Sequence, residues 1–272
     1  MPSKIISEEL KQKIREFYLT KPMTLDYVAQ EFSLSRPTIG KILKDIPKYP
    51  KAKIFNPELK EHFFENIDSE EKAYFLGLLI SDGNVFKDET GRQASISIAL
   101  DLKDEYMLLK FKEVLGTNTN IGHDGRGCGQ LAVRSNIMAK DLEKYGVTPR
   151  KTLTTFLPKI DEKYMNHLIR GIFDGDGSIR AVQTDVRNRF AHYIAFCGTH
   201  QLMEQNSNYC KNLNLETIPL VYDYDDKSLS DIKIQSISDM YIFGEWLYKD
   251  ATIFLKRKKD IYDFFKEHYN LK

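Results

Sequence analysis

The sequence has few cysteines, and they form no recognisable pattern. Its 272 residues include only three, at Cys128, Cys197 and Cys210. An odd and widely spaced set fits neither a disulfide framework nor a four-ligand zinc site. Free thiols suit a reducing compartment, so we expect a cytoplasmic protein, in the nucleoid or in an organelle matrix depending on the host.

Long hydrophobic runs are also missing. The longest uncharged apolar run, near residues 74–80, has about seven residues, against the roughly 20 that a membrane-spanning helix needs. The N-terminus, Met1-Pro2-Ser3-Lys4, lacks the apolar region of a secretory signal. We therefore expect no membrane partner. The start at Met1 and the lack of splice-junction residues at the C-terminus lead us to expect a protein that is not embedded in an intein.

Neither sign of charge dominates. The formal net charge is +1, which argues against a uniformly basic nucleic-acid binder. Basic residues nevertheless cluster between Arg36 and Lys60, and again at residues 256–259. Locally basic surfaces can hold phosphates, so charge alone leaves binding to a polyanion open. The apolar fraction of 42% and the aromatic fraction of 12% are sufficient for folded cores, and the length predicts two or three domains.

One stretch of the sequence occurs twice. Residues 74–85 read YFLGLLISDGNV, and residues 167–179, about ninety positions later, read HLIRGIFDGDGSI. Each copy is an apolar run of helical period that ends in Asp-Gly and leads into a strand-like segment. The recurrence predicts a duplicated unit.

The end of each copy is electrostatically unusual. Asp82 and Asp176 lie where a helix C-terminus carries partial negative charge, which costs roughly 0.3–1 kcal/mol each. The glycine after each would cap its helix in the left-handed conformation. Small residues four apart, Gly77 with Ser81 and Gly171 with Gly175, would let the two helix backbones approach closely.

Packing along that face would bring the two aspartates together. Like charges at two negative helix ends repel unless a divalent cation lies between them, so the pattern predicts a metal site at Asp82 and Asp176. The alternative is two ordinary amphipathic helices that end in Asp-Gly turns.

Residues 1–46 predict three short helices. The second and third, joined by a tight turn before Ser35, have a helix-turn-helix pattern that would present Arg36, Thr38 and Lys41 to a DNA major groove. The alternative is a generic three-helix bundle. Residues 47–62 predict a basic linker, which either lies along a phosphate backbone through Lys51 and Lys53 or is a solvated tether.

The rest of the chain predicts two αββαββα halves, at residues 63–156 and 157–272, in an α+β fold. The expected strands are 84–87, 94–100, 118–123 and 130–134, then 178–185, 189–197, 218–224 and 231–236. Polar residues would alternate onto one exposed face of each sheet and contact DNA there. The candidates are Arg92, Arg126 and Gln130 in the first half, Arg180, Gln183, Arg187, Arg189 and Tyr222 in the second, with Ser97 and His192 also expected on the exposed faces.

The paired stretches resemble the motifs of LAGLIDADG homing endonucleases in their single-chain form with two halves. The motif copies are residues 75–83 and 169–177, and the resemblance covers roughly residues 63–270, including the phrases at 145–149 and 246–248. It implies that the two sheets form a saddle over the DNA major groove. It also implies a monomer that recognises a long asymmetric target and cuts both strands across the minor groove, leaving 3′ overhangs.

The resemblance assigns roles to residues. Asp82 and Asp176 would bind Mg²⁺ or Mn²⁺, next to Ser81 and Gly175, and a basic or polar residue on the last strand of each half would lie near the metal. By position these are Arg134 and Gln235, which with the two aspartates are the catalytic candidates. The chain departs from the motif at Ile80, where the second copy keeps Asp174, so we expect unequal halves.

Three functions remain open from the sequence. The first is an endonuclease encoded by a mobile genetic element and used in intron homing. The second is a DNA-binding transcription regulator without catalytic activity, and the third is an RNA maturase that assists intron splicing.

Overall fold

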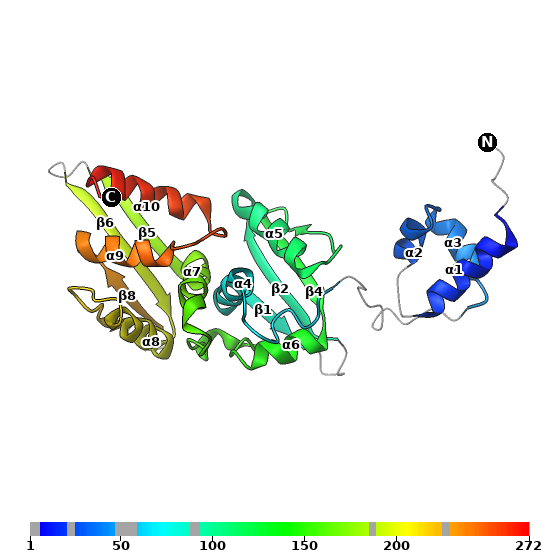
Figure 1. The fold of residues 1–272 in the computed structure, drawn as a ribbon, viewed down its shortest axis with the longest axis horizontal. Coiled ribbons are helices and arrows are strands. Elements are labelled where there is room, and N and C mark those ends of the chain that lie inside the picture. Colours follow the sequence, from blue (N-terminus) through cyan, green and yellow to red (C-terminus); the bar gives the residue numbers. More distant parts are fainter. Residues whose placement is uncertain are drawn as a thin grey trace.

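The structure, a computed structural model, describes residues 6–20, 25–46, 59–87, 93–184, 189–224 and 229–271. The chain has an α+β fold with two four-stranded antiparallel sheets, as the sequence predicted (Figure 1). Four candidate DNA-binding residues, Lys51, Lys53, Arg92 and Arg187, lie outside the described residues. None of the helices in the described ranges is long and apolar enough to cross a membrane.

Three helices precede the sheets: α1 (Glu8–Thr20), α2 (Leu25–Glu31) and α3 (Arg36–Ile42). They share a hydrophobic core of their own, which includes Ile14, Val28 and Ile39. The Ser35 side chain accepts a hydrogen bond from the Thr38 amide and so begins α3. The three-helix prediction is confirmed.

The first unit runs from α4 to α6. Its elements are α4 (Glu70–Ser81), β1 (Gly83–Phe86), β2 (Ser95–Asp101), α5 (Glu105–Leu115), β3 (Gly122–His123), β4 (Cys128–Arg134) and α6 (Asn136–Glu143). The strand order is β1-β2-β4-β3. Residues 59–62, which the sequence assigned to the linker, belong here, because the Lys60 amide donates to Leu115 O and Leu59 is buried in the core.

The second unit repeats this order. It contains α7 (Met165–Asp176), β5 (Gly177–Gln183), β6 (Phe190–Gly198), α8 (His200–Lys211), β7 (Val221–Asp223), β8 (Ser230–Ile234), α9 (Ile237–Leu247) and α10 (Lys256–His268). Its strand order, β5-β6-β8-β7, matches that of the first unit. The third strand of each sheet was predicted too long, since residues 118–121 and 218–220 are not in strands.

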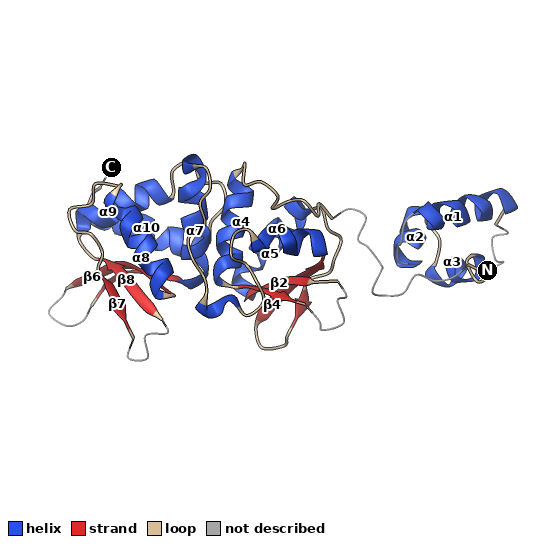
Figure 2. Cartoon of the chain, turned by 90° about the horizontal axis from the view of Figure 1, so that it is seen from below, coloured by secondary structure: helices blue, strands red, loops and turns tan. Residues whose placement is uncertain are grey.

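Both sheets lie on the same side of the molecule, and the helices cover the other side (Figure 2). On the first sheet Ile96, Ile98 and Leu131 face the helices and are buried. Each sheet therefore keeps one face without helices, called its open face below. Two predictions fail here: Ser97 is only 8% exposed, and His192 lies under α10, where it contacts Phe265 and Tyr269.

Helices α4 and α7 lie side by side between the two sheets (Figures 1 and 2). Both are buried along most of their length, because each has a sheet on one side and the other helix on its opposite side. At the contact a Cβ on Gly77 would lie 2.1 Å from Leu168 O, and a Cβ on Gly171 would lie 2.1 Å from Tyr74 O. The predicted close approach at small residues is confirmed.

Replacing either glycine by alanine should separate the helices. Since the clashing atoms are backbone oxygens, Gly77→Ala should lower the free energy of unfolding by about 3 kcal/mol. Urea denaturation followed by fluorescence of the single tryptophan, Trp246, measures this. Gly40→Ala, where a Cβ meets nothing within 4 Å, is the control and should leave the Trp246 transition unchanged. An unchanged transition in Gly77→Ala would contradict the packing.

Candidate functional site

The two aspartates lie where α4 and α7 turn directly into strands. Asp82 is the last residue before β1 and Asp176 the last residue before β5. The glycines that follow are required for space, because a Cβ on Gly83 would lie 2.4 Å from Leu79 O and one on Gly177 would lie 2.5 Å from Phe173 O. The predicted left-handed cap is wrong: neither glycine has a positive φ. The sharp helix-to-strand turn explains Asp-Gly in both copies.

The close helix contact brings the carboxylates together. A Cβ on Gly175 would lie 1.9 Å from Ser81 Oγ and 3.0 Å from Asp82 Oδ2, so the last turns of α4 and α7 touch. Loss of water and then the negative charge of Asp176 raise the pKa of Asp82 to about 6. Loss of water also raises the pKa of Asp176. Both carboxylates remain in contact with solvent, so the pair forms an open acidic site.

Two buried lysines lie against this pair, and the sequence reasoning missed both. Lys151 Nζ donates to Ile80 O at 2.6 Å and to Ser81 O at 2.8 Å. Lys258 Nζ donates to Phe173 O at 2.5 Å, to Asp174 O at 2.9 Å and to Gly177 O at 2.6 Å. Apart from Gly177 O, which belongs to the first residue of β5, these oxygens are main-chain carbonyls in the last turns of α4 and α7, where a cation offsets the negative end of the helix dipole.

Each lysine acts electrostatically on the aspartate of the other unit. Among the positive charges that lower the pKa of Asp82, Lys258 has the largest effect, whereas for Asp176 it is Lys151. A recess of about 200 Å³ has both Lys151 and Asp176 in its lining, together with Cys197 of β6. Burial lowers the pKa of Lys151 and lowers that of Lys258 to about 8. The ammonium group that most favours the ionised form of each carboxylate thus comes from the opposite unit.

A comparison of the two halves could have found the lysines. Lys151 follows α6 and Lys258 follows α9, the corresponding helices of the two units. The sequence reasoning noted the basic run at 256–259 but treated it as a phosphate-binding surface. No local period marks a lysine whose hydrogen-bond partners lie 70 or more residues away.

Arg134 and Gln235 lie further from the carboxylates. Arg134 pairs with Ser95, which pairs with Phe86, the residue of β1 three positions beyond Gly83. At about 3.3 Å per residue this is roughly 10 Å along the sheet from the helix end. Gln235 lies three positions beyond Ile232, whose neighbour Phe196 pairs with Gly177. The backbone of the two helix ends that the lysines bond is therefore nearer to the aspartates than the backbone of Arg134 and Gln235 is, and the catalytic roles of Arg134 and Gln235 stay a prediction.

Ser81 and Gly175 directly precede the two aspartates and lie against each other. Ser81 Oγ donates to Leu78 O at 3.1 Å, and its carbonyl oxygen accepts from Lys151. Gly175 leaves room for Ser81, as the contact above shows. Their predicted place at a metal stays a prediction.

The candidate DNA-binding residues occupy several surfaces. On the second sheet Arg180 and Tyr222 lie on the open face. Gln183 lies on the opposite face of β5, the face that also has Ile179. Gln130 is exposed on β4. The remaining described candidates are Arg126 in the β3–β4 turn, Arg189 before β6, and Arg36, Thr38 and Lys41 on α3, where Arg36 is 3.2 Å from Asp26 and Thr38 Oγ1 is 2.8 Å from Ser35 Oγ.

The aspartate pair suits a hard divalent cation. Among the residues that the structure describes, no group of three or more His, Cys, Asp or Glu side chains could hold a metal. Mg²⁺, however, is commonly bound by one or two carboxylates, with waters and phosphate oxygens as the other ligands. Asp82 and Asp176, which repel each other and face solvent, fit that role.

Comparison with solved structures identifies the fold. The chain is similar to the LAGLIDADG meganuclease I-CpaMI bound to uncleaved DNA, with 14% identity and a TM-score of 0.53, over 75% of this chain and 92% of that one. I-GzeII in complex with its DNA target gives 11% identity and a TM-score of 0.54, over 74% and 92%. I-SmaMI bound to cleaved DNA gives 14% identity and a TM-score of 0.51, over 74% and 89%. The chain therefore has the LAGLIDADG meganuclease fold.

Comparison of sequences adds little. No family model matches the chain. A segment of 122 residues is 26% identical to the DNA-directed RNA polymerase subunit Rpo1C of Methanocaldococcus jannaschii. The match covers 42% of this chain and spans 13% of the length of that subunit.

The raised pKa of Asp82 makes stability depend on pH. A carboxyl group whose pKa is 3.8 when unfolded and about 6 when folded favours the folded state less as pH rises through that range. Asp82→Asn should therefore be more stable than the wild type at about pH 7.5, and in urea denaturation this difference should shrink as pH falls and disappear at about pH 3, below the unfolded pKa.

Asp124→Asn is the control, and its expected change in stability has the opposite sign. Hydrogen bonds from the Arg126 and Cys128 amides lower the pKa of Asp124, so this variant should be less stable than the wild type at about pH 7.5. A wild type as stable as Asp82→Asn at the higher pH would show that the pKa of Asp82 is not raised in the folded protein.

Proposed function

We propose that this protein is a sequence-specific double-strand DNA endonuclease of the homing type, dependent on Mg²⁺ or Mn²⁺. The observation that carries the proposal is the aspartate pair at the adjoining ends of α4 and α7, with a buried lysine bonded to the main-chain carbonyls of each helix end. The pair lies between two sheets whose open faces point to the same side (Figure 2). A duplex lying across both sheets would meet the aspartates between its two half-sites.

Each residue of the site has a chemical task. Asp82 and Asp176 would hold the divalent cation, which when bound polarises a phosphate and makes a water more acidic. Lys151 and Lys258 would stabilise the negative charge that develops on the phosphate and on the leaving 3′ oxygen. The lowered pKa of Lys258, about 8, also allows it to exchange a proton near neutral pH. With one aspartate and one lysine from each unit, this site would serve both strands, cut them and leave 3′ overhangs.

The two open faces differ, which supports an asymmetric target read by a monomer. In the second unit Arg180 pairs with Tyr193, and Lys233 Nζ lies 4.2 Å from the ring of Tyr193. In the first unit the strands pair Ala99 with Gln130. Charged and aromatic side chains on one half and small or neutral ones on the other would contact different base edges.

The N-terminal helices would extend DNA recognition as a helix-turn-helix. Arg36, Thr38 and Lys41 lie on α3, which follows α2 after a short turn in which the Leu34 amide donates to Ala29 O at 2.9 Å. This element would place α3 in a major groove next to the main target.

Replacing the aspartates should abolish cleavage. The wild type, Asp82→Asn and Asp176→Asn are incubated with Mg²⁺ and a library of DNA duplexes, and double-strand breaks are counted. We expect specific cleavage by the wild type and at least a 100-fold loss in either variant, since each removes a charged ligand. Cleavage that survives both substitutions would contradict the metal site. A wild type that binds a specific duplex without cutting it would favour a transcription regulator, and one that binds and helps splice an intron RNA would favour a maturase.

Removing residues 1–46 should weaken DNA binding but not the chemistry. Loss of three phosphate or base contacts from α3 predicts about a 10-fold or larger increase in Kd, with the single-turnover rate on saturating DNA unchanged. Gel-shift titration in Ca²⁺ and a quenched cleavage assay measure the two quantities. Identical affinities would refute a recognition role for α1–α3.

A further inference from the structure

We propose that the first unit positions Lys258, the lysine of the second unit, through Tyr106 and Glu70. These two residues are positioning residues, because neither lies at the aspartate pair. The catalytic consequence rests on the proposed endonuclease function. The anchoring itself is a property of the fold and can be measured without DNA.

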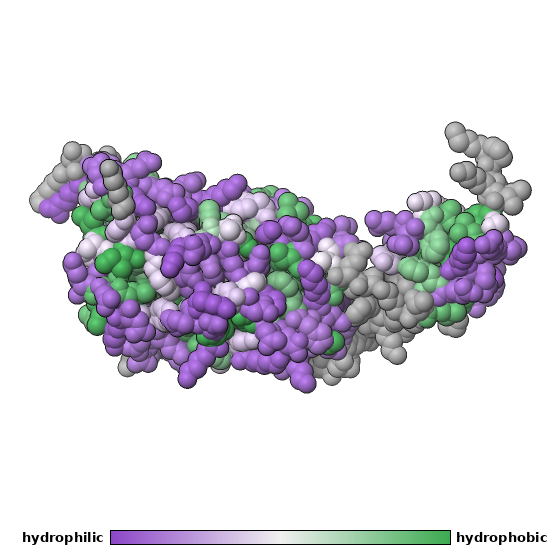
Figure 3. All heavy atoms as spheres, in the orientation of Figure 1, coloured by the Kyte–Doolittle hydropathy of each residue, from purple (hydrophilic) through white to green (hydrophobic). Residues whose placement is uncertain are grey.

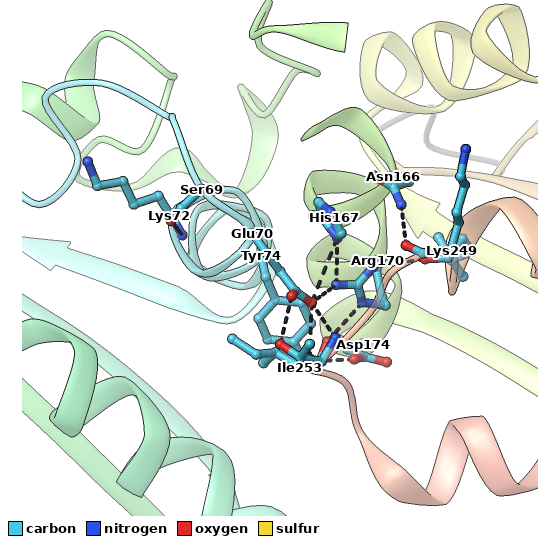
Figure 4. A network of polar contacts seen from close by, with 12 residues as sticks. Ser69, Glu70, Lys72, Tyr74, Asn166, His167, Arg170, Asp174, Lys249 and Ile253 are labelled. Atoms are coloured by element: carbon cyan, nitrogen blue, oxygen red, sulfur yellow. Dashed lines mark hydrogen bonds and ion pairs between the residues drawn. The ribbon is translucent and has the colours of Figure 1, made fainter. Parts of the chain in front are cut away.

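Lys258 lies in the first turn of α10, directly after residues 252–255, which are in neither a helix nor a strand. The segment is fixed by side chains almost residue by residue. Glu70 of α4 accepts from the Thr252 amide at 2.8 Å, from Thr252 Oγ1 at 2.7 Å and from the Ile253 amide at 3.0 Å (Figure 4). A carboxylate with three such partners holds the chain in one position.

Tyr106 of α5 fixes the next turn of the segment. Its hydroxyl donates to Phe254 O at 3.3 Å and accepts from the Lys256 amide at 2.7 Å. The Lys256 ammonium lies 5.3 Å from the centre of the same ring. One hydroxyl group from the first unit therefore spans the residues on both sides of Leu255.

Further contacts complete the anchor. The Leu255 amide donates to Asp174 Oδ2 at 2.8 Å, and Tyr74 of α4 donates to the same oxygen at 2.8 Å. Arg257 is 2.8 Å from Asp104 of the first unit. Glu70 is itself held 2.6 Å from the fully buried Arg170, whose guanidinium also donates to Ile253 O at 2.8 Å (Figure 4).

The arrangement has a counterpart at the other lysine. After Lys151 the chain is held by the second unit, because Thr199 Oγ1 donates to Thr155 O at 2.6 Å and Gln205 Oε1 accepts from the Leu157 amide at 2.7 Å. The two anchors differ, however, since Ile80 is apolar where Asp174 bonds Leu255. Loss of the Lys258 anchor should therefore affect one site and leave the other intact.

The test uses Tyr106→Phe, which removes one hydroxyl and keeps the ring. Strand-resolved single-turnover cleavage with Mg²⁺, on the duplex that the wild type cuts, should show one strand slowed about 10-fold or more, because a displaced catalytic group loses rate steeply. The other strand and the Kd for DNA in Ca²⁺ should be unchanged. Lys258→Met identifies the affected strand, and Tyr106→Phe added to Lys258→Met should cause no further loss. Glu70→Gln should repeat the pattern.

Tyr164→Phe is the matched control, because the Tyr164 hydroxyl also links the two units, through Asp68 O, but does not touch residues 252–258. It should leave both strands unaffected. Equal slowing of both strands by Tyr106→Phe, or a further loss in the Lys258→Met background, would overturn the proposal.

Hydrogen–deuterium exchange separates this proposal from the proposed function. Amides in residues 252–258 should exchange faster in Tyr106→Phe than in the wild type, while those of α4 and α7 stay protected. Unchanged exchange in 252–258 would overturn the anchoring even if DNA is cut. Faster exchange in a protein that cuts no DNA would support the anchoring and refute the endonuclease instead.

Discussion

The rest of the structure depends on the contact between α4 and α7 at Gly77 and Gly171. There the backbones are so close that a single methyl group on either glycine would overlap a carbonyl oxygen. This contact joins two units that each have their own sheet, and it brings two helix C-termini to one point. The face shown in Figure 3 is mostly hydrophilic with smaller hydrophobic areas, whereas α4 and α7 are buried along most of their length against each other and the sheets. The contact stabilises the fold by packing, but it also brings the like charges of Asp82 and Asp176 together, which destabilises the fold.

Buried cations offset that cost. Lys151 and Lys258 donate hydrogen bonds to main-chain carbonyls at the two helix ends. Each lysine is also the positive charge that most lowers the pKa of the carboxyl group of the opposite unit. An acidic pair with two ammonium groups at the same helix ends, open to solvent on one side, suits a site that binds a hard cation and a phosphate together. The lysines are held by segments that the other unit anchors. Neither half therefore builds its site alone, which gives a physical reason why the duplicated halves remain in one chain.

The sequence predicted the features that repeat locally. Helical period and alternation gave two αββαββα units, and the small residues at Gly77 and Gly171 indicated how the helices meet. Long-range contacts could not be predicted from the sequence. Nothing near Lys258 in the sequence indicates that its ammonium group bonds the end of a helix some eighty residues earlier. Arg134 and Gln235 were placed near the metal because the family resemblance puts a residue of the last strand of each half there. The strand register puts their backbone several residues along the sheet from the helix ends. The glycines after Asp82 and Asp176 were read as left-handed caps, whereas close packing requires them.

The most direct test of the account is anomalous diffraction from a crystal of the DNA complex grown with Mn²⁺. The account predicts manganese peaks ligated by both Asp82 and Asp176 and by a phosphate oxygen, with the duplex across the open faces of the two sheets and Lys151 and Lys258 beside the scissile phosphates. Manganese bound elsewhere, or DNA held on the helical side, would contradict it.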